Sequence, residues 1–97
     1  MPVTAPPDDM AGQAWALHGS VQLRPEPFGA LAYHFGTRRL SFLKTPELVD
    51  VVRRLADCPD VATALREAGV PEADRPAYLV ALRSLAAGGM ITRREPA

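Results

Sequence analysis

A β-hairpin in the middle of the chain limits most strongly what this sequence can fold into. Residues 28–35 and residues 38–43 are two strand-like apolar runs, and only Gly36 and Thr37 separate them. A two-residue loop that begins with glycine is typical of a type II′ turn, whose twist suits two antiparallel strands. The sequence therefore predicts that the two runs pair directly with each other.

The turn also predicts which residues face each other across the hairpin. One face is then apolar and holds Leu31, Tyr33, Leu40 and Phe42. The opposite face is small or polar and pairs Ala32 with Ser41 and His34 with Arg39. A slip of one residue would mix the two faces, so their separation supports this register. We expect His34 to be a surface or cross-strand residue.

A further strand is expected just before the hairpin, at residues 21–24, where apolar and polar side chains alternate. Pro25 and Pro27 limit its length, because proline cannot donate a hydrogen bond to a strand ladder. The three runs together predict a three-stranded antiparallel sheet.

After Leu43 the spacing of apolar residues changes from two to 3.6, which indicates helices. A helix is predicted over residues 46–57, with Thr45 as its N-cap and Pro46 in its first turn. A shorter helix over 61–68 follows the capping residue Asp60, a third helix covers 75–87, and residues 90–92 form a last extended piece. The fold class is therefore α+β, a β-β-β sheet followed by three helices.

The domain boundaries follow from periodicity and length. A chain of 97 residues is one small domain. Residues 1–13 have no periodicity and few groups to bury, so we expect a mobile N-terminal tail. The domain itself is expected at residues 14–92, with a C-terminal tail at 93–97.

Several functional classes are excluded by residue type. Cys58 is the single cysteine, so no intramolecular disulfide, cysteine-based zinc site or iron–sulfur cluster can form. His18 and His34 lack a third ligand at a recognisable spacing, and the carboxylates suit helix starts. We expect no catalytic residue, no metal and no cofactor. Without a signal-peptide pattern or a long apolar run, a cytoplasmic protein with no membrane partner is expected.

The charge is distributed unevenly along the chain. Basic and acidic residues balance over the whole sequence, but residues 21–54 contain six basic and three acidic side chains. Arg38 and Arg39 precede the last strand, and Lys44 follows it. If the strands are ordered sequentially, residues 38–43 form a free edge that an extended peptide could join. The residues alone leave open that the arginines only protect this edge. If a peptide does join it, a Ser41→Pro exchange is expected to remove an edge donor.

The helices at 61–68 and 75–87, joined by residues 69–71, also resemble a helix-turn-helix, so a winged-helix DNA-binding regulator is the alternative. The second helix offers Arg75 and Arg83 for phosphate contacts. Its other surface positions are apolar and include Ala77, Val80, Ala81 and Ala87. This composition favours a protein or peptide groove over nucleic acid.

Residues 21–43, with residues 15–18 ahead of them, resemble the PqqD-like family of precursor-peptide recognition domains, and within it the chaperones of mycofactocin biosynthesis. The stretches at 24–31 and 38–43 carry the narrower resemblance, which extends over residues 14–92. It implies a winged-helix-like, non-catalytic domain. Such a domain binds the leader of a ribosomally made precursor, here MftA, and presents it to a radical S-adenosylmethionine maturase, here MftC.

The resemblance further implies that the leader adds as a strand along residues 38–43 and lies beside the third helix. The peptide-binding residues it indicates are Arg38, Arg39, Leu40, Ser41, Phe42, Leu43, Tyr78, Leu79, Leu82 and Arg83. The iron–sulfur cluster and S-adenosylmethionine would belong to the partner. A homodimer stays open, because residues 14–20 could pack on the sheet or swap onto a second copy.

Overall fold

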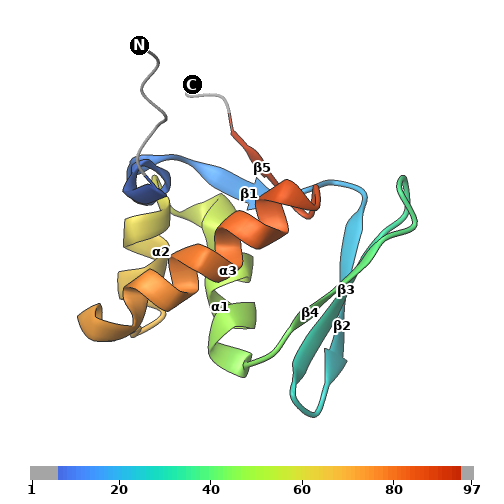
Figure 1. Cartoon of the computed structure of the whole chain (residues 1–97), viewed down its shortest axis with the longest axis horizontal. Helices are drawn as coiled ribbons and strands as arrows, with labels where there is room; N and C mark the ends of the chain where they lie inside the picture. Colours follow the sequence, from blue (N-terminus) through green and yellow to red (C-terminus); the bar gives the residue numbers. More distant parts are fainter. Residues whose placement is uncertain (1–6, 95–97) are drawn as a thin grey trace.

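The computed structural model describes residues 7–94, and its α+β class is the one predicted (Figure 1). The strands are β1 (Trp15–Leu17), β2 (Val21–Glu26), β3 (Gly29–His34), β4 (Leu40–Leu43) and β5 (Ile91–Arg93). The helices are α1 (Pro46–Arg54), α2 (Val61–Glu67) and α3 (Arg75–Ala87), with short 3-10 segments η1 (Pro7–Gly12), η2 (Leu55–Asp57) and η3 (Glu72–Asp74). None of the helices within residues 7–94 is long and apolar enough to cross a membrane.

The three-stranded antiparallel sheet has the sequential order β2-β3-β4, and the predicted hairpin register is confirmed: Leu31 lies opposite Phe42 and Tyr33 opposite Leu40. The predicted turn type is wrong. His34 N donates to Arg39 O over 3.0 Å, and Arg38 takes the left-handed conformation with φ 64°. The loop therefore spans residues 35–38. This four-residue loop and the predicted two-residue loop of Gly36 and Thr37 have the same midpoint, so the pairing of residues across the two strands is unchanged.

β2 runs through Pro25 to Glu26, beyond the predicted end at residue 24. Phe35 N donates to Ser20 O over 2.8 Å, in line with the β2–β3 register. Because hydrogen-bonded pairs alternate in an antiparallel ladder, the backbone of Pro25 faces away from β3. The missing donor is therefore on the open side of an edge strand, where it disrupts no ladder.

The helices cover the small-residue face of the hairpin and leave its apolar face open. Ala30 and Ala32 are buried, and α1 packs against β3, whereas Leu40 and Phe42 are 56% and 60% exposed. Alanine lets the helix backbone approach the sheet closely. His34 is a cross-strand residue, opposite Val21, but it does not lie at the surface, because its side chain is only 5% exposed.

The loop at the end of the hairpin explains why a histidine can be buried there. His34 Nδ1 accepts hydrogen bonds from the backbone N–H groups of Gly36 at 3.0 Å and Thr37 at 3.1 Å. Its ring packs against that of His18, with centroids 4.4 Å apart. The loop thus satisfies the ring nitrogen that burial would otherwise leave without a partner.

The predicted helix starts are confirmed. Thr45 Oγ1 accepts from Leu48 N at 3.1 Å, and Asp60 Oδ1 accepts from Thr63 N at 2.8 Å. The sequence predicted a single helix over residues 46–57. In the structure the α-helix ends at Arg54, and the 3-10 segment η2 continues it to Asp57.

A second sheet, which the sequence did not predict, joins the two ends of the domain. β1 pairs antiparallel with β5, and Leu17 lies opposite Ile91 in the same chain. Parts of both expected tails are packed. Met10 in η1 is buried, and Arg94 donates to the carbonyl oxygens of Trp15 and Cys58. The remainder of the expected tails, residues 1–6 and 95–97, lies outside the described residues.

Candidate functional site

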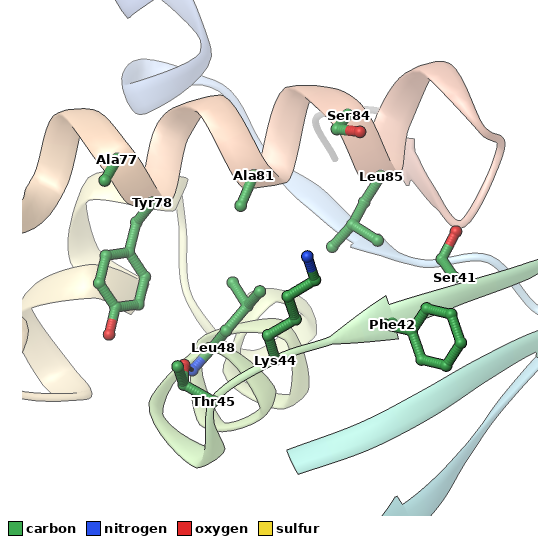
Figure 2. A pocket seen from close by; sticks show the side chains of 10 residues that line it. All are labelled: Ser41, Phe42, Lys44, Thr45, Leu48, Ala77, Tyr78, Ala81, Ser84 and Leu85. Atoms are coloured by element: carbon green, nitrogen blue, oxygen red, sulfur yellow. Dashed lines mark hydrogen bonds between the residues drawn. The ribbon is translucent and has the colours of Figure 1, made fainter. Parts of the chain in front are cut away.

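A cavity of about 480 Å³ lies between strand β4 and helix α3, with the start of α1 at one end (Figure 2). Its lining is mainly apolar or small and consists of Ser41, Phe42, Lys44, Thr45, Leu48, Ala77, Tyr78, Ala81, Ser84 and Leu85. We call this cavity the groove. It follows the open side of the hairpin, where no further strand of the described residues is paired with β4.

The open edge of β4 presents free backbone groups beside the groove. His34 and Arg39 form a hydrogen-bonded pair, so in this register Ser41 pairs in the same way with Ala32. The N–H and C=O groups of Leu40 and Phe42 then point away from β3. The expectation for Ser41→Pro was therefore misplaced, because the N–H of Ser41 faces the inside of the sheet.

Helix α3 forms the opposite wall with small side chains. Ala77, Ala81 and Ser84 recur at helical spacing, so they lie on the side of α3 that lines the groove. Figure 2 shows Tyr78 at one end of this wall and Leu85 at the other. Small residues leave room between helix and strand, and the two larger residues bound that space.

A positive charge projects into the groove from the end of β4. In Figure 2 the side chain of Lys44 extends toward α3, with its ammonium group in the space between Ala81 and Leu85. No carboxylate within residues 7–94 forms an ion pair with Lys44. The groove therefore combines apolar walls with one cation available to an anionic ligand group.

The structure brings some of the predicted site residues together and separates others. Ser41, Phe42 and Tyr78 line the groove. Leu43 and Leu82 are buried in the core, at 1% and 0% exposure, and Leu79 packs against that core.

The predicted basic residues and Leu40 do not line the groove. Arg38, Arg39 and Leu40 are exposed near the far end of β4. Arg83 is half-buried outside the lining.

Sequence reasoning missed Lys44, Thr45, Leu48, Ser84 and Leu85 as groove residues, and it noted Ala77 and Ala81 only as apolar surface positions that favour a peptide groove, without assigning them as binding residues. A signal for the helix wall was present, because Ala77, Ala81 and Ser84 follow helical spacing. Thr45 and Leu48 gave no such signal, since an N-cap and a core residue explain them fully.

Other chemistry finds little support in residues 7–94. No cluster of three or more histidine, cysteine or acidic residues in this part of the chain could hold a metal ion. Burial raises the pKa of the Cys58 thiol, and the negative charge of Glu67 raises it further. A raised pKa leaves less of the reactive thiolate. What the groove can do is hold an extended ligand between a strand edge and a helix.

Comparisons with known proteins agree with a peptide-binding role. Residues 14–92 match the family described as the peptide chaperone MftB family. The peptide chaperone MftB of Mycobacterium ulcerans is 54% identical over 83 residues, which cover 86% of this chain and 76% of the relative. The proteins of the same name from Mycobacterium tuberculosis and Mycolicibacterium smegmatis are 53% and 52% identical over 83 residues, or 86% of this chain, and these cover 76% and 81% of the relatives. No solved structure matches the chain, so the winged-helix-like arrangement stays a prediction.

Proposed function

This chain belongs to the peptide chaperone MftB family, and from that membership we propose that its groove binds the leader of the mycofactocin precursor MftA and presents it to the radical S-adenosylmethionine maturase MftC. The observation that carries the proposal is the groove between β4 and α3, bordered by a free strand edge. The role is binding, and the chemistry belongs to the maturase.

The leader would bind as an additional strand. The outward backbone groups of Leu40 and Phe42 offer hydrogen bonds to an extended chain. Side chains alternate along such a strand, so every second residue of the leader would point into the groove. Apolar leader side chains would contact Tyr78 and Leu85, and a leader carboxylate would meet Lys44.

Presentation acts through proximity. A precursor held by its leader is delivered together with the chaperone, so its encounter with the maturase becomes local instead of bimolecular. Effective concentrations for short flexible links are in the millimolar range. The chaperone therefore accelerates maturation without supplying a reacting group.

The test is to fill the groove. An Ala81→Phe exchange adds a ring to the groove wall at a half-buried position, and it keeps the β-carbon through which Ala81 packs against the edge of the core. Calorimetry with synthetic MftA leader should show affinity at least about tenfold weaker, which is about 1.4 kcal/mol. Val80→Phe is the matched control, because Val80 is 58% exposed on the same helix and outside the groove, and it should bind like wild type. Unchanged affinity of a folded Ala81→Phe variant would contradict binding in the groove.

A separate assay on the wild-type protein addresses the alternative of a DNA-binding regulator. Duplex DNA is the probe in a salt titration, since binding to phosphates weakens steeply as salt rises. We expect no salt-dependent binding to duplex DNA by wild type. Binding to duplex DNA that weakens steeply with salt, together with no binding of the leader, would favour a winged-helix DNA-binding regulator instead.

A further inference from the structure

Lys44 is the one charged side chain among the described residues that line the groove. In the open groove this side chain is exposed, so water solvates its ammonium group. A peptide lying in the groove would cover that group. Taking a charge out of water costs free energy unless a counter-charge and hydrogen-bond partners replace the water. The groove therefore favours a ligand that brings an anionic group to Lys44 and disfavours a ligand that leaves the ammonium covered and unpaired.

Two hydroxyl groups lie at the same end of the groove as this cation. Figure 2 shows Ser41 on β4 and Ser84 on α3 toward the Leu85 end, where the ammonium group of Lys44 also lies. Ammonium and hydroxyl groups all donate hydrogen bonds, and the two oxygens of a carboxylate can accept several at once. We call Ser41, Lys44 and Ser84 the donor cluster. Its chemistry suits a carboxylate.

The opposite end of the groove suits an apolar side chain. Leu48, Ala77 and Tyr78 line it, and no charged side chain of the described lining lies there (Figure 2). An apolar group placed at this end would lose no water from a charge and would gain contact with the tyrosine ring. The groove thus has two ends with different preferences.

Strand addition connects the two ends to positions in one peptide. Ser41 lies opposite the buried Ala32, so its side chain is on the face of the sheet that meets the helices. A peptide residue that pairs with Ser41 would point its side chain to the same face, into the groove. The next side chain on this face is two residues along the peptide, about 7 Å away.

We propose that the groove selects a leader with an acidic side chain held by the donor cluster and an apolar side chain, two residues away, at the Tyr78 end. The identity of the peptide rests on the proposed function, and the proposal adds the side-chain chemistry that the groove selects. Main-chain hydrogen bonds along β4 would serve any extended peptide, so they supply affinity without choosing a sequence. The donor cluster supplies the choice.

The test combines charge changes in the protein with charge changes in the peptide. Lys44→Met removes the charge and keeps a long side chain, and Lys44→Arg keeps the charge. Arg53→Met is the matched control, because Arg53 is exposed on α1 outside the groove lining. The probes are synthetic MftA leader and leader variants in which one aspartate or glutamate at a time is replaced by its amide. Calorimetry gives the affinity of each combination.

We expect Lys44→Met to bind the unchanged leader about tenfold more weakly, the equivalent of about one charge-assisted hydrogen bond. Lys44→Arg and Arg53→Met should stay within about threefold of wild type. One amide exchange in the leader should weaken binding to wild type about tenfold and have little further effect with Lys44→Met, because both changes remove the same interaction. Alanine at the apolar leader residue two positions from that acid should weaken binding to wild type and to Lys44→Met alike.

Several outcomes would overturn the proposal and leave the proposed function intact, because wild type still binds the leader in each. The first is unchanged leader affinity of Lys44→Met. The second is a set of amide exchanges that act equally on wild type and Lys44→Met. The third is an equal loss in Lys44→Met and Arg53→Met, because overall charge then explains the effect. Failure of the leader to bind wild type would overturn the proposed function itself.

Discussion

The carbonyl oxygen of Leu43 lies so close to Gly29 that a side chain at Gly29 would overlap with it. Gly29 also has φ 156°, a conformation that residues with a side chain rarely adopt. The start of β3 and the end of β4 can therefore approach each other only because residue 29 is glycine. Since β4 borders the groove, this contact also positions the candidate binding edge.

A Gly29→Ala exchange should destabilise the protein by about 2 kcal/mol or more, because the new methyl group displaces β4 and strains the backbone. Urea unfolding followed by circular dichroism measures the change. Gly19→Ala is the control, since no heavy atom lies within 4 Å of a Cβ placed there. Equal stability of the two variants would mean that the close contact is not maintained in solution.

The free edge of β4 can be tested by removing one backbone donor. Phe42→Pro removes the N–H that points outward, and Phe42→Ala removes the ring alone. We expect the proline variant to bind MftA leader about five- to tenfold more weakly than the alanine variant, the equivalent of about one hydrogen bond. Calorimetry on both folded variants gives the ratio, and a ratio near one would argue against strand addition.

Burial of His34 makes its ring a structural element of the hairpin loop. His34→Ala removes the acceptor of the Gly36 and Thr37 N–H groups and the contact with His18, so a loss of about 2–4 kcal/mol is expected. His34→Gln keeps an acceptor group and should lose less. Chemical denaturation of both variants checks the order, and a neutral His34→Ala exchange would contradict the burial.

Asp60 should contribute stability that depends on pH. Hydrogen bonds from the Thr63 side chain and backbone lower the pKa of Asp60 below its ordinary value of 3.8. A lowered pKa in the folded state gives stability that is complete above the ordinary value and is lost as pH falls through the lowered one. Asp60→Ala should therefore cost about 1 kcal/mol at neutral pH and progressively less in acid. Thermal unfolding of the wild-type protein and the Asp60→Ala variant from neutral to acidic pH measures the difference in their stability. A difference in stability that does not change with pH would be inconsistent with a lowered pKa of Asp60.

The Cys58 thiol should react slowly in the folded protein. Burial, followed by the charge of Glu67, raises its pKa, so the thiolate fraction at neutral pH is small. We expect a thiol reagent such as DTNB to react much faster after unfolding in urea. In the folded protein the rate should rise at a higher pH than for a free cysteine, and equal rates in the two states would refute burial of the thiol.

The candidate site was predictable from sequence only in part. Residues 38–43 were identified as an edge, and Ser41, Phe42 and Tyr78 do line the groove. Leu43 and Leu82 proved to be core residues, because an apolar residue of a strand or helix can face either way and the pattern of one element does not decide which. Lys44 was noted only as a flanking charge, and its position in the groove depends on α3, which lies more than thirty residues later in the chain.

By itself the sequence determined the elements and their local ends: the hairpin register, the three helices, and the caps Thr45 and Asp60. These depend on interactions between residues close together in the chain, which local patterns record. Only the tertiary structure decided which face of the hairpin meets the helices. The small side chains of Ala30 and Ala32 let α1 approach, so the larger side chains of the opposite face stay exposed. The same long-range packing paired β1 with β5 and placed the groove beside β4.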